Sequence, residues 1–411
     1  MPSRSSTRGG SLPVRYMGTK RHMVDAVRET VLSLHPEGAV VDLFAGMGTV
    51  AASLAADVPI VANDALGFVA CIARARFLGA DRMTPSDAAA KRLLPAFEAH
   101  ARWLCEFDAE RLDAERIALD ASDPELATHM RRAAHVASSA TARRAAQAAS
   151  RSSSRDFYRM SSLYFSTGYF THSQAIALDA LRAAIDADTV VDERDWLLSA
   201  WLGAASAVMN APGHTAQYLF PRSHAAAERV RRAARLDVWE LFVRALSENV
   251  QVGTGSWRAQ NKVTSSDALT LLNSNAVADA SVLYADPPYT RDQYSRFYHV
   301  YETLYRYDYP DSRGQGRNRS DGFMTDFSKK SGVEAAFRAL LRGARRMQLP
   351  LVISYPENGL LTTAGATVLG VANEFYANVE VFTVAASHST MGGSKGSQRK
   401  SASEQLFVLT N

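Results

Sequence analysis

The sequence contains few cysteines and no long apolar run. Cys71 and Cys105 stand apart, with no CxxC pair or Cys/His cluster around them. This disfavours a disulfide framework or a structural zinc site, so we expect a reducing compartment and no metal. No apolar stretch reaches the roughly 18 residues that a membrane span needs. Residues 1–13 are rich in Ser, Arg and Gly, and we expect a disordered start with no secretory signal.

A strong excess of charge of one sign is also missing. The 411 residues carry a formal net charge of +4, with 47% hydrophobic and 21% charged residues. These values are ordinary for a soluble globular protein of two or three domains. The mild excess of positive charge allows a polyanionic partner without requiring one. We expect a cytoplasmic protein.

A strand, a glycine turn, a helix and a second strand follow one another near the N-terminus. Ala39–Phe44 is a short apolar run rich in β-branched residues, which predicts a buried parallel strand. The turn Ala45–Gly48 leads into a predicted helix at Thr49–Ala56. The next strand, Pro59–Asn63, ends at Asp64. This order predicts a βαβ unit.

The glycine turn predicts a site for a cofactor that contains adenosine. Glycines let the backbone turn sharply and let a ligand approach the amides at the start of a helix. A carboxylate in the position of Asp64 can accept hydrogen bonds from both ribose hydroxyls. The pattern alone fits NAD, FAD or S-adenosylmethionine. Ala51 stands where the third glycine of the dinucleotide motif would be, which suits a cofactor without a pyrophosphate.

A second motif, Asp286-Pro287-Pro288-Tyr289, follows the apolar run Ala280–Ala285. Active sites of open α/β sheets lie at such strand ends. The prolines remove two backbone donors, so nearby carbonyls are left as acceptors.

This motif suits methylation of an aromatic amine, whose lone pair is delocalised into the ring. The Asp286 carboxylate and the Pro287 carbonyl could each accept one amine hydrogen, which favours a pyramidal, more nucleophilic nitrogen. Tyr289 could stack on the base, and Asp286 would stabilise the growing positive charge. A base inside a duplex would have to be flipped out to reach this site.

The segment between the motifs differs in composition. From about Pro85 to Ala245, Ala and Arg become frequent and apolar residues recur at helical spacing, whereas α/β patterning returns near Asn261. We therefore expect an α/β, Rossmann-like sheet split by a mainly helical insertion. The expected parts are a disordered terminus, the two halves of a catalytic domain and the insertion, at residues 1–13, 14–84 with 260–411, and 85–259.

Together these residues resemble the DNA adenine-N6 methyltransferases, in the subgroup that has a target-recognition insertion between its cofactor and catalytic motifs. Tyr16–Lys20 (YMGTK) is similar to its Y-x-G-x-K element, Phe44–Gly48 to its FxGxG and Asp286–Tyr289 to its DPPY. Gln293–His299 is similar to a segment that often follows DPPY.

The resemblance implies a role for each matching residue. It implies Asp286, Pro287, Pro288 and Tyr289 as catalytic residues, and S-adenosylmethionine as the cofactor. It implies that Lys20 lies near the cofactor carboxylate and Asp64 at its ribose. The full set of implied cofactor-binding residues is Tyr16, Met17, Gly18, Lys20, Asp42, Phe44, Gly46, Gly48, Asp64 and Asp267.

The resemblance also implies double-stranded DNA as the partner, and a bacterial or phage-encoded protein associated with the nucleoid. A cognate restriction endonuclease or another defence component is compatible with it. RNA base-amine methylation and cytosine-N4 methylation stay open as alternatives. The former usually lacks the long insertion, and the latter more often has Ser at the position of Asp286. Arginine-rich loops, including Arg313, Arg317 and Arg319, suit phosphate contacts about as well as a solvated surface.

Overall fold

The computed structural model describes residues 14–16, 20, 22–137, 141, 144–145, 148, 155–388 and 400–411; for residues 133–137, 385–388 and 400–402 it describes the backbone alone. Contacts within the chain define two compact units. One contains Asp81–Asn210 and Leu219–Val252. The other contains Tyr16–Ala80, Ala211–Tyr218 and Gly253–Asn411, and we call it the sheet unit.

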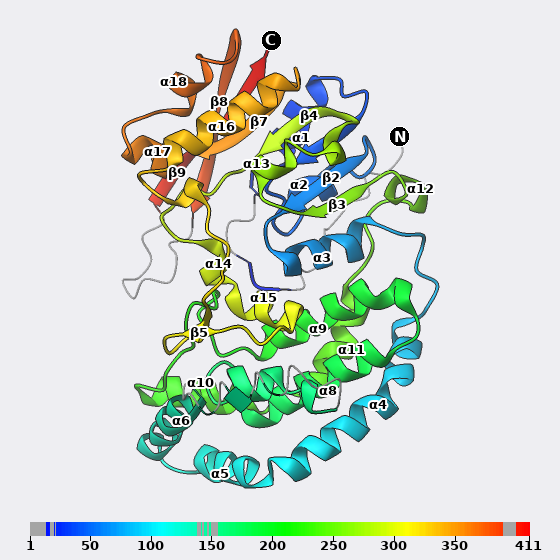
Figure 1. Ribbon diagram of the computed structural model, residues 1–411, viewed down its shortest axis with the longest axis vertical. Helices are drawn as coiled ribbons and strands as arrows, with labels where there is room; N and C mark the ends of the chain where they lie inside the picture. Colours follow the sequence, from blue (N-terminus) through cyan, green and yellow to red (C-terminus); the bar gives the residue numbers. More distant parts are fainter. Residues whose placement is uncertain are drawn as a thin grey trace. The chain divides into compact units, whose positions relative to one another are not determined.

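The sheet unit is built on a seven-stranded sheet in the order β3-β2-β1-β4-β7-β9-β8 (Figure 1). The pairs from β3 to β7 are parallel, whereas β9 runs antiparallel to both β7 and β8. The strands are β1 (Ala39–Asp42), β2 (Ile60–Asp64), β3 (Lys262–Ser265), β4 (Ala280–Ala285), β7 (Leu351–Pro356), β8 (Asn378–His388) and β9 (Lys400–Thr410). The family-level expectation of a Rossmann-like α/β sheet is confirmed in this coarse form.

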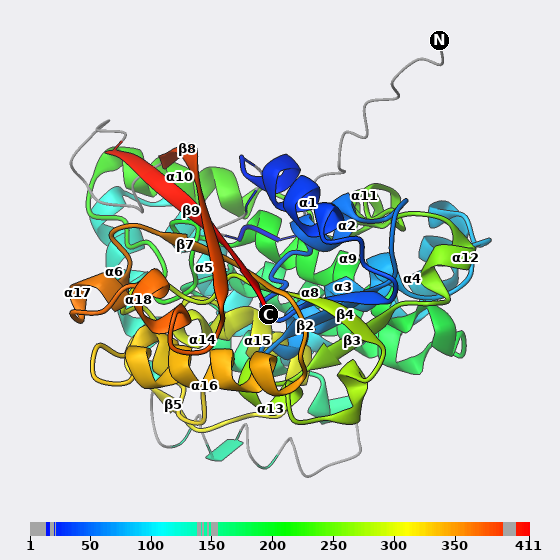
Figure 2. The same ribbon diagram turned by 90° about the horizontal axis from the view of Figure 1, so that it is seen from above.

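Helices cover both faces of this sheet. Figures 1 and 2 show α13 (Ala268–Leu271) and α16 (Val333–Arg346) on one face, and α1 (Val24–Ser33) and α2 (Thr49–Ser53) on the other. Alternation along β1 explains the two faces: Val41 and Leu43 pack into the core under α16, while Val40 and Asp42 point the other way. With both faces covered, β1, β4 and β7 are almost entirely buried and read as continuous apolar runs.

The other helices of the sheet unit are short and follow the strand ends. They are α3 (Gly67–Phe77), α12 (Gly255–Arg258), α14 (Tyr294–Phe297), α15 (His299–Arg306), α17 (Leu360–Thr363) and α18 (Val368–Ala372). A two-stranded hairpin, β5 (Ser312–Arg313) with β6 (Asn318–Arg319), lies between α15 and α16.

The second unit is helical in its described part. It contains α4 (Ser86–Phe107), α5 (Ala109–Asp120), α6 (Asp123–Ala137), α8 (His172–Ala187), α9 (Arg194–Val208), α10 (His224–Ala234) and α11 (Val238–Glu248). A capping box between Thr171 and Gln174 begins α8. The indole N–H groups of Trp196 and Trp201 donate to the carbonyls of Leu246 and Leu178, so both indoles are buried with their donors satisfied.

Most predicted elements match within a few residues. The sequence from about Val14 to Leu34 also predicts a helix-like stretch, but α1 begins only at Val24, and Tyr16 and Lys20 lie in irregular backbone. Because Tyr16 and Lys20 are not part of the helix, both side chains can reach the edge of the sheet.

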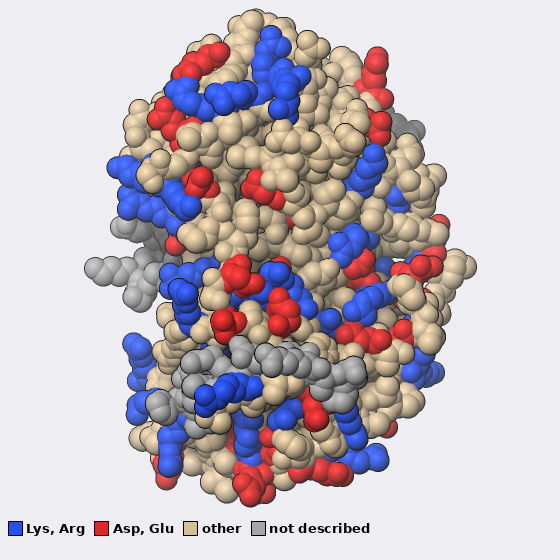
Figure 3. Space-filling view, in the orientation of Figure 1, with Lys and Arg blue, Asp and Glu red and all other residues tan. Residues whose placement is uncertain are grey.

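Figure 3 shows Lys and Arg interspersed with Asp and Glu over the face drawn, as the small net charge leads one to expect.

Candidate functional site

The two halves of the sheet meet at β1 and β4, which pair in parallel although more than 200 residues separate them. β1 continues to β2 on one side, and β4 continues to β7 on the other. This reversal of strand order is the switch point at which open α/β sheets form ligand clefts beyond their carboxyl ends. A cleft with about 990 Å³ of empty space, its open mouth included, lies at this point.

The glycine turn forms one wall of the cleft, and its glycines are required by geometry. Gly46 and Gly48 have φ angles of 48° and 69°, a left-handed conformation that side chains resist. A Cβ on Gly48 would lie 2.4 Å from Cε2 of Phe77, and one on Gly46 would lie 3.3 Å from the Tyr16 ring. The turn therefore tolerates no side chain at Gly48 without displacing α3.

Asp64 ends β2 beside this turn and holds it in place. One carboxylate oxygen accepts the Gly46 N–H at 3.1 Å, and the other accepts the Leu66 N–H at 2.9 Å. Burial raises the pKa of Asp64 to about 6, against these two backbone donors, which lower it. Each oxygen retains a lone pair, so the group can still accept a hydroxyl from a ligand.

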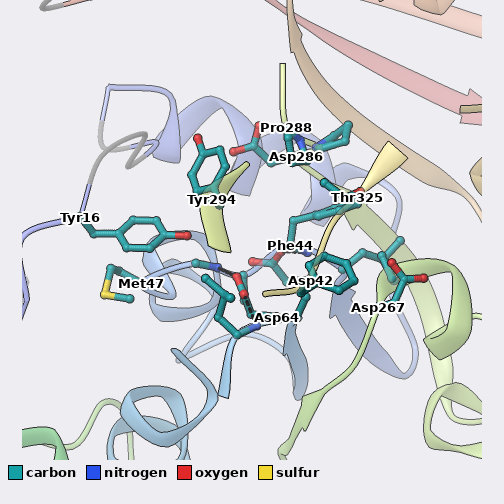
Figure 4. A pocket seen from close by; sticks show the side chains of 18 of the residues that line it. Tyr16, Asp42, Phe44, Met47, Asp64, Asp267, Asp286, Pro288, Tyr294 and Thr325 are labelled. Atoms are coloured by element: carbon teal, nitrogen blue, oxygen red, sulfur yellow. Dashed lines mark hydrogen bonds between the residues drawn. The ribbon is translucent and has the colours of Figure 1, made fainter. Parts of the chain in front are cut away.

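Asp42, at the end of β1, is buried more deeply. It accepts the Phe44 N–H at 3.2 Å, and burial raises its pKa to about 8. Most Asp42 side chains are therefore protonated at pH 7, and a neutral carboxyl can donate as well as accept a hydrogen bond. Figure 4 shows Asp42 beside Phe44, between Asp64 and Asp286.

Asp286 lies on the opposite wall, directly after β4. Its Oδ1 is 3.1 Å from Nζ of Lys20 and accepts a hydrogen bond from Oγ of Ser354, also at 3.1 Å. The hydroxyl of Tyr284 lies 2.8 Å from the same Ser354 oxygen. Burial raises the pKa of Asp286, and Lys20 and Ser354 oppose this rise. The carboxylate is thus oriented by an ion pair and a hydrogen bond before any substrate arrives.

Glu404 on β9 completes the ion cluster, and the sequence analysis missed it. Its Oε2 lies 2.8 Å from Nζ of Lys20, and its side chain is 1% exposed. Its carboxylate raises the pKa of Asp286, whereas the Lys20 cation lowers it. No local signal marks Glu404, since it simply precedes the apolar residues of its own strand. Only the antiparallel pairing of β9 with β7 brings it to Lys20.

An aromatic group lines the mouth of the cleft. The Tyr16 ring stacks on Tyr298, with centroids 4.4 Å apart and planes at 13°, and lies 6.2 Å from Tyr294. Phe44 contacts Phe327 edge-on at 5.4 Å. Tyr294 also lines the cleft, together with Gln293. Both lie in the 293–299 segment singled out after DPPY.

Almost all the predicted site residues that the structure describes line this cleft. They are Tyr16, Lys20, Asp42, Phe44, Gly46, Asp64, Asp267, Asp286, Pro287, Pro288 and Tyr289 (Figure 4). Gly48 shapes the turn just behind them. Met17 and Gly18 lie outside the described residues. Asp267 also caps α13, because its carboxylate accepts the N–H groups of Leu269 and Thr270. Lys20 bridges the carboxylates of Asp286 and Glu404.

The structure corrects the interpretation of two loop arginines. Arg317 and Arg319 are only 3% and 8% exposed. Arg319 is held by Asp308 and Asp321, at 2.6 Å and 2.9 Å. Two neighbouring carboxylates neutralise this guanidinium, so it braces the hairpin and is not offered to a phosphate. Arg313 remains exposed.

Among the described residues, no group of three or more His, Cys, Asp or Glu side chains could hold a metal ion. None of the described helices combines the length and apolarity needed to cross a bilayer.

Comparison with known proteins shows which proteins the segment around this site resembles. Residues 233–348, which contain Asp286–Tyr289, match the D12 class N6 adenine-specific DNA methyltransferases. The chain is 24% identical over 339 residues to modification methylase LlaI of Lactococcus lactis subsp. lactis, covering 80% of this chain and 44% of the relative. It is 26% identical over 199 residues to type II methyltransferase M.FokI of Planomicrobium okeanokoites, covering 47% and 27%.

Part of the chain is therefore similar to the D12 class N6 adenine-specific DNA methyltransferases, which confirms the resemblance drawn from the motifs. The chain spans less than half the length of these two relatives.

Proposed function

We propose that this protein transfers a methyl group from S-adenosylmethionine to the exocyclic N6 amine of an adenine flipped out of DNA. One observation carries the proposal. The glycine turn with Asp64 and the Asp286–Tyr289 motif, far apart in the sequence, form opposite walls of one cleft. Such a cleft can hold an adenosine-containing cofactor and an aromatic amine side by side, as direct transfer between them requires.

The cofactor wall fits S-adenosylmethionine. The free lone pairs of Asp64 suit ribose hydroxyls, and Phe44 offers an apolar edge. The turn keeps its shape because Gly46 and Gly48 both have a positive φ that favours glycine. When bound, the cofactor supplies a methyl group activated by a sulfonium. We assign cofactor binding to the residues of this wall, with Asp267 near the adenine end.

The catalytic wall would act on the amine. The Asp286 carboxylate accepts one N6 hydrogen and the Pro287 carbonyl accepts the other, which localises the nitrogen lone pair toward the methyl donor. Tyr289 stacks on the base. Lys20 and Ser354 hold Asp286 in one orientation, so little reorganisation is needed as positive charge develops on the nitrogen. Lys20 acts here as a positioning residue.

We propose further that the helical insertion, residues 85–259, recognises the DNA target, and that the two flanking segments form the catalytic domain. The two relatives are by name a modification methylase and a type II methyltransferase, which supports duplex DNA as the substrate and a restriction endonuclease or another defence component as a partner. A bacterial or phage protein of this kind would work in the cytoplasm, at the nucleoid.

The main alternatives act on other amines. Cytosine-N4 methylation is chemically close, but Asp286 stands where that group more often has Ser. An RNA base amine is the other candidate, and the long insertion weighs against it. Each alternative predicts a different methylated base, so one experiment that identifies the methylated base distinguishes them.

Long-read sequencing of DNA from cells that express the chain tests the proposal. We expect N6-methyladenine at one short motif with the wild type, and none with Asp286→Ala. Asp279→Ala is the matched control, since that carboxylate is 80% exposed and pairs with Lys262 on the surface. Methylcytosine, or a DNA free of any mark while purified protein methylates RNA, would refute adenine-N6 methylation of DNA.

A further inference from the structure

Two segments run side by side at the mouth of the cleft, and side-chain hydrogen bonds join them. The Gln293 amide exchanges both of its hydrogen bonds with the backbone of Thr325: Nε2 donates to the carbonyl at 3.1 Å, and Oε1 accepts the N–H at 3.0 Å. The Ser328 hydroxyl donates to the carbonyl of Asp292 at 3.1 Å. Residues 322–331 are therefore fixed against the chain that leaves the catalytic motif.

The cleft end of this pair presents apolar side chains to solvent. Phe323 is 37% exposed and lines the cleft, and the next residue, Met324, is 62% exposed. Their neighbours in sequence are Ser320, Asp321, Gly322, Thr325 and Asp326. Exposed large apolar residues on a polar loop, anchored beside a binding cleft, indicate a contact made with a partner.

The other end of the same pair of segments is basic. A shallow hollow is lined by Arg291, Ser328, Lys330 and Ser331. Arg291 and Lys330 are exposed. Two cations and the Ser331 hydroxyl match the oxygens of a phosphodiester, whereas the Ser328 hydroxyl is held by the Asp292 carbonyl. One short, fixed edge thus offers apolar groups beside the cleft and phosphate-binding groups further along.

We propose that this edge holds the DNA strand around the extruded nucleotide: Met324 enters the base stack where the adenine leaves, and Arg291 and Lys330 bind an adjacent backbone phosphate. The inference rests on the proposed function and names the residues that support base flipping. Extruding a base costs a few kcal/mol of pairing and stacking. An apolar wedge offsets part of this cost by stacking on the bases that are left. A long, unbranched thioether suits a gap of variable shape.

The test compares Met324→Ala with the wild type on two duplexes that contain the target motif. In one the target adenine is paired, and in the other it faces an abasic site, so that pairing no longer opposes extrusion. We expect Met324→Ala to lose at least about tenfold in kcat/KM on the paired duplex and less than about threefold on the other. Met324→Leu should retain most activity on both. Met83→Ala, at an 86% exposed methionine of the helical unit, is the surface control.

If Met324→Ala loses kcat/KM equally on the two duplexes, or on neither, Met324 does not act as a wedge, while adenine methylation still stands. A wild type that methylates no adenine would refute the proposed function itself. For the basic end, Arg291→Gln with Lys330→Gln should raise KM and reduce the salt dependence of DNA binding by about two units of log–log slope. An unchanged slope would remove these residues from the DNA contact.

Discussion

The Lys20 cation and the Glu404 carboxylate push the pKa of Asp286 in opposite directions, so changing them should move activity in opposite directions. Catalysis as proposed needs the Asp286 carboxylate ionised, because only that form accepts the amine hydrogen on either oxygen. Activity should therefore fall as the pH falls through the pKa of Asp286. In Lys20→Met the cation at 3.1 Å is lost, the pKa rises and the acidic limb moves to higher pH. In Glu404→Gln the limb moves to lower pH.

The structure sets the size of the effect. Two unit charges 3.1 Å apart interact by about 5 kcal/mol at an effective dielectric constant of about 20, equivalent to about 4 pKa units. This is a ceiling, because Glu404 shares the Lys20 charge. We expect an upward shift of about 1 to 3 units for Lys20→Met. Lys20→Met should also lose about 3 to 5 kcal/mol of stability near pH 8, since it removes the cation that two buried carboxylates share.

The stability effect takes its sign from Asp286, whose pKa is raised by burial. A buried acid whose pKa lies above its unfolded value favours folding most at low pH, and that contribution is lost as the pH rises through the folded pKa. The instability of Lys20→Met should therefore ease as the pH is lowered. Profiles of kcat/KM against pH between about 5 and 9, with urea melts at each pH, measure both effects. Lys262→Met, which breaks an exposed ion pair, is the control. If the acidic limbs of Lys20→Met and Glu404→Gln move in the same direction, or do not move although both variants fold, the electrostatic account is refuted.

Three further predictions concern the two walls of the cleft. Asp286→Ala should abolish transfer while calorimetry still detects S-adenosylmethionine binding; residual transfer near the wild-type rate would remove Asp286 from catalysis. Because the pKa of Asp64 is raised to about 6, cofactor affinity should weaken as the pH falls below about 6. Asp64→Ala should bind weakly at every pH, and a wild-type affinity in that variant would exclude a ribose contact. Gly48→Ala should destabilise the protein by about 1 to 3 kcal/mol more than Gly213→Ala, because both have positive φ but only Gly48 would clash, with Phe77; equal urea midpoints would contradict the clash.

Local sequence patterns were sufficient to predict the elements of the sheet and the two motifs at its edge. The apolar run at residues 280–285 could only be a strand, and the four residues after it carry enough chemistry to suggest their substrate. Lys262–Ser265 likewise predicts a short strand, and β3 has these bounds. Such patterns survive because a strand buried on both faces must be apolar throughout, and a turn with positive φ must contain glycine.

Long-range packing decided the rest. Glu404 and Ser354 carry no local signal, and they reach Asp286 only because β7 lies between β4 and β9 in the sheet. The arginines at 317 and 319 belong to a loop that reads as solvated, yet Arg319 is buried between Asp308 and Asp321. Burial and charge pairing depend on which distant segments pack together, and so do the pKa values of Asp42, Asp64 and Asp286. The sequence by itself determined which residues could bind a cofactor and an amine; the tertiary structure decided how those residues are charged, because it alone sets their neighbours and their access to water.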